Sequence, residues 1–129
     1  MAGIYIHIPF CKTRCVYCDF YSTTRNDLKP RYIDAVCKEL TMRRDYLQGE
    51  AVRTVYFGGG TPSQLEEEDF RQVFDTLSDI YGLDACEEIT LEANPDDLTE
   101  DYVTMLRRLP FNRISMGIQT FDDSTLRLL

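Results

Sequence analysis

The chain has 129 residues, 43% of them hydrophobic, and this length and composition predict a single globular domain with an apolar core. Its formal net charge is −8, which argues against a general nucleic-acid-binding surface, because such a surface needs clustered lysines and arginines. The sequence contains no run of about 18 apolar residues, so no transmembrane helix is expected. The first strand begins at once, with no signal-peptide pattern, so we expect a cytoplasmic protein.

The N-terminal third of the chain predicts a strand, a long connection and a helix. Residues 4–8 alternate but carry large groups on both sides, which is typical of a strand buried on both faces, and Pro9 ends it. The connection over 10–28 is longer than most loops, and connections of this length usually carry functional residues. Apolar residues at helical spacing then predict a helix over about 30–47.

The rest of the chain repeats this alternation. The predicted segments are a strand over 52–57 that the glycines at 58–60 end, a helix over 66–80, a strand over 88–93, a helix to Leu109 capped by Thr99, a strand over 113–118 and a last helical piece capped by Asp122 or Asp123. Strands and helices in this order predict an α/β fold with a parallel sheet and helices on its outer side. The order alone does not distinguish an open sheet from part of a barrel.

Three of the five cysteines, Cys11, Cys15 and Cys18, follow the first strand at the spacing C-x₃-C-x₂-C. Iron–sulfur clusters are held by cysteine thiolates, and three thiolates leave one iron of a cubane open to chelate a small molecule. Such clustering indicates metal binding in a reducing compartment rather than a disulfide framework. A structural zinc module is the alternative, and it would need a fourth ligand such as His7 or Asp19.

The other two cysteines and the single histidine are interpreted as structural residues. Cys37 lies on the apolar side of a predicted helix and is expected to be a small buried hydrophobe. Cys86 lies in a connection and is assigned no role. His7, alone on a strand, is predicted to be a hydrogen-bonded core residue rather than a ligand.

Five stretches in a fixed order carry a family resemblance. They are YIHIPFC at 5–11, CVYCDF at 15–20, YFGGGTPS at 56–63, EANP at 92–95 and RISMGIQ at 113–119. Together they resemble the radical S-adenosylmethionine (SAM) superfamily, in particular the group of oxygen-independent coproporphyrinogen III oxidase (HemN) and the heme chaperone HemW. The resemblance implies that residues 1–129 are the N-terminal part of a radical SAM core domain, about four units of a partial (β/α)₆ TIM-like barrel. The remaining units and a C-terminal domain would then be absent.

The resemblance also implies the ligands and their contacts. Cys11, Cys15 and Cys18 would bind a [4Fe–4S] cluster whose open iron takes the amino and carboxylate groups of SAM. The residues that match SAM contacts are Tyr5, Tyr17, Phe20, Gly58, Gly59, Gly60, Thr61, Glu92 and Gln119. The glycine run permits close backbone approach, and a carboxylate such as that of Glu92 can accept hydrogen bonds from a ribose diol. The competing interpretations are a strand-ending turn for the glycines, a solvated strand end for Glu92 or Gln119, and core packing for the aromatic residues.

The chemistry that the resemblance implies is reductive cleavage of SAM to methionine and a 5′-deoxyadenosyl radical. No catalytic residue is identified. The expected partners are SAM, heme or a porphyrinogen, and an electron donor such as flavodoxin or ferredoxin; heme is a candidate ligand of the full-length protein. The oxidase pattern has a further cysteine that would fall at position 20, where this chain has Phe20, and a sizeable segment before the first strand. Both departures favour a heme chaperone, with the decarboxylating oxidase as the alternative.

Overall fold

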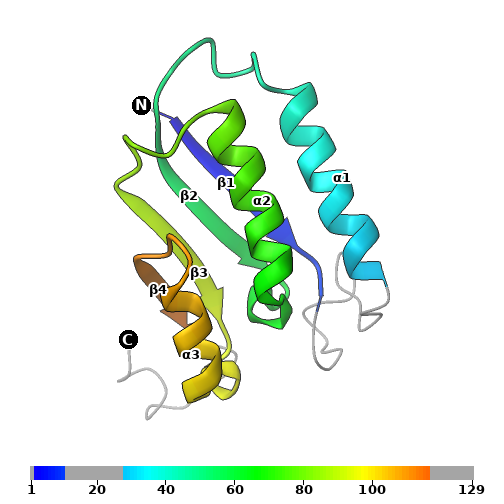
Figure 1. The fold of residues 1–129 in the computed structure, drawn as a ribbon, viewed down its shortest axis with the longest axis vertical. Coiled ribbons are helices and arrows are strands. Elements are labelled where there is room, and N and C mark those ends of the chain that lie inside the picture. The colour runs from blue at the N-terminus through cyan, green and yellow to red at the C-terminus, as the bar shows by residue number, and fades with distance from the viewer. Residues whose placement is uncertain (1, 11–27, 117–129) are drawn as a thin grey trace.

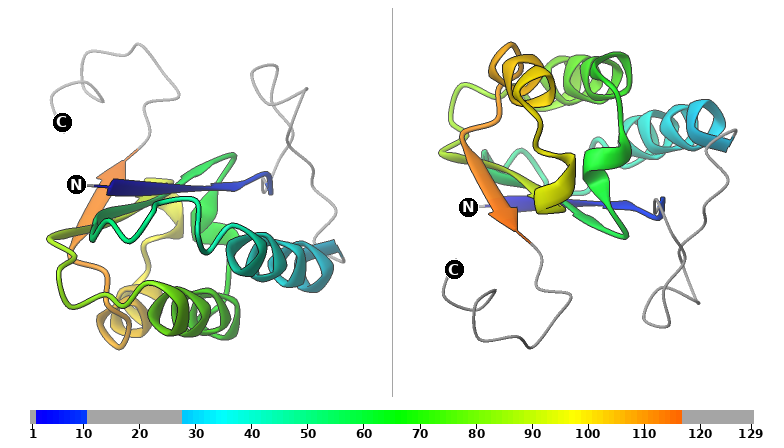
Figure 2. Two further views of the ribbon diagram at one scale, coloured as in Figure 1. Left: turned by 90° about the horizontal axis from the view of Figure 1, so that it is seen from above. Right: turned by 90° about the horizontal axis from the view of Figure 1, so that it is seen from below.

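The computed structural model describes residues 2–10 and 28–116. These residues form a four-stranded parallel sheet in the order β1-β2-β3-β4, with the helices on one face (Figures 1 and 2). The strands are β1 (Ala2–Ile8), β2 (Val52–Gly59), β3 (Glu88–Ala93) and β4 (Arg113–Met116). The helices are α1 (Lys29–Met42), α2 (Glu67–Ile80) and α3 (Glu100–Arg107), with short 3₁₀ turns η3 (Pro62–Gln64) and η4 (Pro95–Asp97). The predicted α/β class and parallel sheet are confirmed.

Phe57 lies at the centre of the apolar core between the sheet and the helices. Its ring centroid is 5.8 Å from that of Phe70 and 5.4 Å from that of Phe74, both on α2. The ring of Phe111, just before β4, lies 5.4 Å away on the same side of the sheet. Edge-on and tilted aromatic contacts of this kind bury much apolar area, so they hold α2 and the approach to β4 against β2. The other core residues on the strands are Ile6, Ile8, Val52, Val55, Ile89, Leu91 and Ala93.

The opposite face of the sheet is open, because no helix of the described chain covers it (Figure 2). Tyr5 projects from this face of β1 and is 58% exposed. The prediction that the first strand is buried on both faces is therefore wrong for the described residues. His7 is exposed on the same face and hydrogen-bonds to the Tyr5 hydroxyl, so it is not the core residue that the sequence predicted.

The ends of α1 and β2 also differ from the prediction, and β1 begins at Ala2, two residues before its predicted start. Helix α1 ends at Met42, and the chain continues through turns to Gly49, where φ is +80°. The side chains of residues 42–46 are exposed, so no core contact supports a further helical turn, although Leu47 still packs against the core. Strand β2 continues to Gly59, two residues beyond its predicted end, because Gly58 and Gly59 pair with the end of β1.

The ends of α2 and α3 are close to those predicted. Glu66 and Asp69 form a capping box at the start of α2, and the Thr99 hydroxyl accepts a hydrogen bond from the Tyr102 backbone at the start of α3. Cys37 packs against the core on the apolar side of α1, as expected, but it is only partly buried. Among the described helices, none has the length and apolar content needed to span a bilayer.

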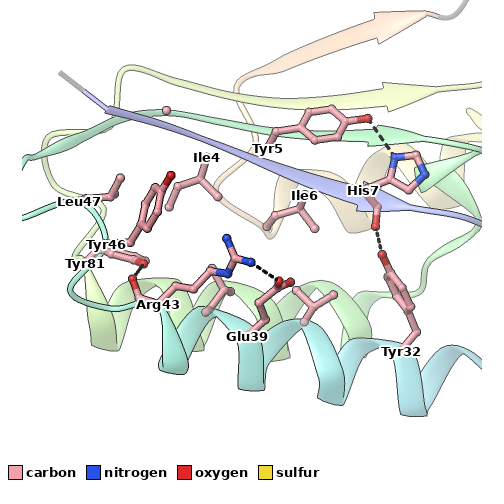
Figure 3. A pocket seen from close by; sticks show the side chains of 13 residues that line it. Ile4, Tyr5, Ile6, His7, Tyr32, Glu39, Arg43, Tyr46, Leu47 and Tyr81 are labelled. Atoms are coloured by element: carbon pink, nitrogen blue, oxygen red, sulfur yellow. Dashed lines mark hydrogen bonds and ion pairs between the residues drawn. The ribbon is translucent and has the colours of Figure 1, made fainter.

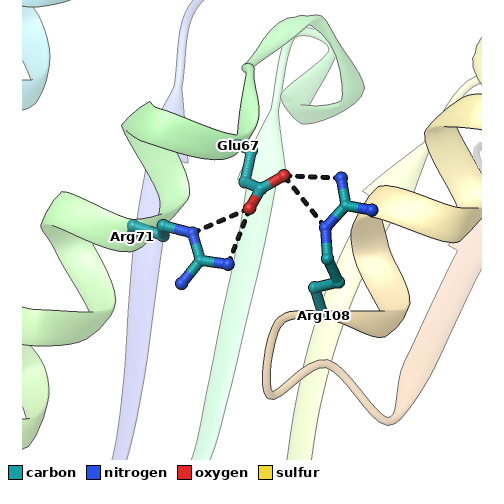
Figure 4. A network of polar contacts seen from close by, with 3 residues as sticks. All are labelled: Glu67, Arg71 and Arg108. Atoms are coloured by element: carbon teal, nitrogen blue, oxygen red, sulfur yellow. Dashed lines mark hydrogen bonds and ion pairs between the residues drawn. The ribbon is translucent and has the colours of Figure 1, made fainter.

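An ionic cluster joins α2 to the residue that ends α3 (Figure 4). Glu67 accepts hydrogen bonds from Arg71, one turn along α2, and from Arg108. The hydrogen bonds from Arg108 and then Arg71 lower the pKa of Glu67. A carboxylate with a lowered pKa favours the folded state at pH values above its unfolded pKa, and this contribution is lost as the pH falls through the lowered value. The cluster lies at the surface, so its contribution is screened by solvent.

We expect the isolated 129-residue chain to self-associate through β4. Within the described residues β4 pairs only with β3, and Ile114 is 45% exposed beside a groove formed with Val103, Leu106 and Phe111. An unpaired edge with apolar surface invites pairing with another chain. Size-exclusion chromatography with light scattering would measure this, and Ile114→Lys should reduce the association. A stable wild-type monomer with a sharp thermal transition would contradict the prediction.

Candidate functional site

The glycine run lies beside the point where the chain enters the cysteine segment. Gly58 and Gly59 pair with the last residues of β1, and the backbone N–H of Gly60 donates to the Ile8 carbonyl at 2.8 Å. The Thr61 N–H then donates to the Phe10 carbonyl at 2.7 Å. Phe10 is buried and immediately precedes Cys11 in the chain. Ile8 and Phe10, which precede Cys11 in the sequence, are therefore held against Gly60 and Thr61.

The two glycines at the end of β2 are required by their neighbours. Gly59 has φ of +117°, a conformation that L side chains rarely adopt, and an added Cβ would lie 2.7 Å from the Ile8 carbonyl oxygen. A Cβ on Gly58 would lie 2.7 Å from the ring of Tyr56 and 2.8 Å from that of Tyr5. Close packing against β1 and its aromatic neighbours is thus sufficient to explain these glycines, whether or not a ligand also approaches them.

A row of polar side chains crosses the open face of the sheet. The rings of Tyr5 and Tyr56 stack across β1 and β2, with centroids 5.8 Å apart and planes 17° apart. The Tyr56 hydroxyl donates to Oε2 of Glu92 on β3 at 2.7 Å. Burial and the nearby Glu92 carboxylate raise the pKa of both tyrosines, so both hydroxyls stay protonated at neutral pH. The row therefore presents one carboxylate held by a neutral donor.

The loops that follow β2 and β3 are held together by partly buried polar contacts. The Ser63 hydroxyl in η3 donates to Asp97 in η4 at 2.8 Å and accepts from the Asn94 backbone N–H at 3.2 Å. The Gln64 side chain donates to the same carboxylate at 3.2 Å. Thr61 and Ser63 are both buried. These contacts fix the glycine loop relative to the end of β3, which carries Glu92.

The described chain thus brings six of the predicted site residues to one region, the carboxyl ends and open face of β1 to β3. They are Tyr5, Gly58, Gly59, Gly60, Thr61 and Glu92. The predicted metal ligands and the remaining predicted SAM contacts lie outside the described residues; they are Cys11, Cys15, Cys18, Tyr17, Phe20 and Gln119. Within residues 2–10 and 28–116, no group of three cysteine, histidine or acidic side chains could hold a metal ion.

Sequence reasoning missed Tyr56 and the Ser63–Asp97 contact. Both lie in or beside stretches that carry the family resemblance, but neither matches a SAM contact in it. Strand alternation was the available signal for Tyr56, since a residue two positions before Gly58 shares its face of the strand. No comparable signal pairs Ser63 with Asp97, because the two residues are 34 positions apart.

A separate cleft of about 390 Å³ lies between β1 and α1 (Figure 3). Its apolar lining includes Ile4 and Ile6, and the Tyr32 hydroxyl at one end donates to the His7 carbonyl. Of the predicted site residues that the structure describes, only Tyr5 lines it. The cleft is therefore distinct from the region where the glycine loop and Glu92 meet.

Comparison with known proteins places the chain in a family. The profile of the radical SAM superfamily matches residues 5–129. The heme chaperone HemW of Lactococcus lactis is 37% identical over 95% of this chain and 32% of that protein, and HemW of Escherichia coli is 38% identical over 98% and 34%. The oxygen-independent coproporphyrinogen III oxidase of Synechocystis is 38% identical over 94% of this chain and 27% of that protein.

A solved structure agrees with these sequence matches. The structure of coproporphyrinogen III oxidase (HemN) from Escherichia coli, described as a radical SAM enzyme, superposes with a TM-score of 0.80 and 33% identity. The superposition covers 98% of this chain and 30% of HemN. The chain thus spans about a third of the length of the relatives it matches. Because the family profile covers nearly all of its residues, the chain belongs to the radical SAM superfamily.

Proposed function

We propose that residues 1–129 are the N-terminal part of a radical SAM core domain in which Cys11, Cys15 and Cys18 hold a [4Fe–4S] cluster beside bound SAM. The observation that carries this proposal is the hydrogen bond from Thr61 to the Phe10 carbonyl. It holds Phe10, the residue before Cys11 in the sequence, against the glycine loop, and the contact of Ser63 with Asp97 holds that loop near the strand that carries Glu92. A metal site on these cysteines would then lie beside a small-molecule site at the glycine loop.

The described residues fit SAM. The Glu92 carboxylate faces the open side of the sheet and can accept hydrogen bonds from ribose hydroxyls. The lack of side chains at Gly58 and Gly59 allows close packing at the end of β2, and the exposed ring of Tyr5 offers an apolar face beside this loop. When bound, the cluster supplies the electron for reductive cleavage of SAM. The described residues would bind and orient SAM for that step.

For the whole protein we propose a heme chaperone of the HemW type. Sequence identity does not separate the two types, because a HemW and an oxidase are each 38% identical to this chain. The feature that favours the chaperone is Phe20, which stands where the oxidase pattern has its further cysteine. Its partners would be SAM, heme and an electron donor such as flavodoxin or ferredoxin.

The full-length protein is expected to bind heme and to leave coproporphyrinogen III unchanged under anaerobic, reducing conditions with SAM. The reason is that the chain lacks the oxidase pattern's further cysteine. Product analysis by chromatography and heme titration by absorbance would measure the two properties in parallel. An oxygen-independent coproporphyrinogen III oxidase assayed alongside provides the positive control. Decarboxylation to protoporphyrinogen IX would favour the oxidase instead.

A further inference from the structure

Tyr56 is held in one orientation on the open face of the sheet. One side of its ring stacks on Tyr5, at 5.8 Å between centroids. The adjacent space over Gly58 is filled by the two rings, since an added Cβ there would lie within 2.7 Å of Tyr56 and 2.8 Å of Tyr5. A ring confined on these sides has little freedom to rotate, so its hydroxyl points steadily toward β3.

The hydroxyl meets the one carboxylate that the proposed function assigns to SAM. The Tyr56 oxygen lies 2.7 Å from Oε2 of Glu92 and donates to it. A carboxylate has acceptor sites on both oxygens, so this bond leaves Oε1 able to receive a ligand hydroxyl. Within the described residues, this hydrogen-bond partner of the carboxylate is a neutral hydroxyl rather than a cation. A hydroxyl partner, unlike a cation, does not neutralise a carboxylate, and hydrogen bonds to an ionised acceptor are the stronger kind.

We propose that Tyr56 is a positioning residue for SAM, which fixes the Glu92 carboxylate in the orientation that accepts the ribose hydroxyls. The inference rests on the proposed function, because it assumes that Glu92 meets the ribose. A freely rotating glutamate would lose side-chain entropy on binding the ligand. A glutamate already held by Tyr56 loses less, so its hydrogen bonds contribute more to affinity.

The test is Tyr56→Phe in the full-length protein carrying a reconstituted cluster. The substitution keeps the ring, its stacking and the β2 packing, and removes only the hydroxyl. The probes are SAM and its 2′-deoxyribose analogue, each titrated at equilibrium without reductant. We expect the Kd for SAM to rise about tenfold, as for loss of a hydrogen bond to a charged group. The Kd for the analogue should rise less, so that the preference for ribose falls.

Two further variants separate positioning from general structure. Tyr81→Phe removes a tyrosine hydroxyl that donates to the Arg43 carbonyl at 3.1 Å, and it should leave the affinity for SAM unchanged. Glu92→Gln should weaken SAM binding itself, and adding Tyr56→Phe to it should change the Kd by less than about twofold, since coupled residues are not additive. Thermal unfolding of each variant would show that the fold is retained.

The possible results distinguish this inference from the proposed function. If the wild type binds SAM and Tyr56→Phe binds it equally well, the positioning role is excluded while the proposed function stands. The same conclusion follows if Tyr56→Phe weakens SAM and the 2′-deoxy analogue by equal factors, or acts additively with Glu92→Gln. Failure of the reconstituted wild type to bind SAM would overturn the proposed function, and this inference with it.

Discussion

Cys15→Ala is expected to abolish the iron–sulfur absorbance of the anaerobically reconstituted protein. A cubane normally has a cysteine thiolate on each protein-bound iron, and the motif provides three. Removing one thiolate leaves only two cysteine ligands for the four irons, and two ligands are too few to retain the cluster. The measurement is an ultraviolet–visible spectrum after reconstitution with iron and sulfide, together with iron and sulfide analysis.

Cys37→Ala is the matched control for this experiment. Cys37 lies on α1, outside the motif, and its thiol donates a weak hydrogen bond to the Gln72 carbonyl at 3.7 Å. We expect the control to retain full absorbance. Tight binding of one zinc with no iron would point instead to a structural zinc module, and unchanged absorbance in Cys15→Ala would exclude this cysteine as a ligand.

Gly59→Ala should lower the free energy of unfolding by about 2–4 kcal/mol, from the combined cost of a strained backbone and an overpacked contact. The contact is with the Ile8 carbonyl oxygen, 2.7 Å from the added Cβ, and backbone in a sheet cannot easily move away. Relieving it would separate the ends of β1 and β2 and weaken the bond from Gly60 to Ile8. The affinity for SAM should fall as well. Urea unfolding would measure the free energy of unfolding, and a binding titration would measure the affinity.

Gly49→Ala separates the two sources of this cost. Gly49 also has positive φ, +80°, but nothing lies within 4 Å of an added Cβ. Its substitution should therefore cost only the backbone term, about 1–2 kcal/mol. Equal destabilisation by the two substitutions would show that close approach to β1 contributes nothing at Gly59.

Much of the fold was predictable because each element carries its own local pattern. The apolar stripe of α2 and the Thr99 cap of α3 are properties of neighbouring residues, and both elements begin and end close to the predicted positions. The end of α1 was not predictable from spacing, because Leu47 reaches the core from a turn as well as it would from a helix. Whether Tyr5 is covered depends on the elements opposite its face, and local alternation carries no information about them.

The candidate site divides in the same way. The cysteine motif and the glycine run are contiguous, so the sequence alone indicates them. The bond from Tyr56 to Glu92 joins residues 36 positions apart, and it depends on the register of β2 against β3. That register cannot be inferred from the identity of either residue. It follows from the packing of Phe57 and Leu91, which are opposite each other on the helix-covered face.

That shared register affects whether mutations can change the alignment of Tyr56 with Glu92 without also disturbing the core. A one-residue slip of β2 would exchange its two faces, and would expose Phe57 at the same time as it displaced Tyr56 from Glu92. A one-residue slip therefore cannot harm the site alone, since it also removes a buried aromatic side chain from the core. Selection for a folded chain therefore also acts against a one-residue slip that would separate Tyr56 from Glu92.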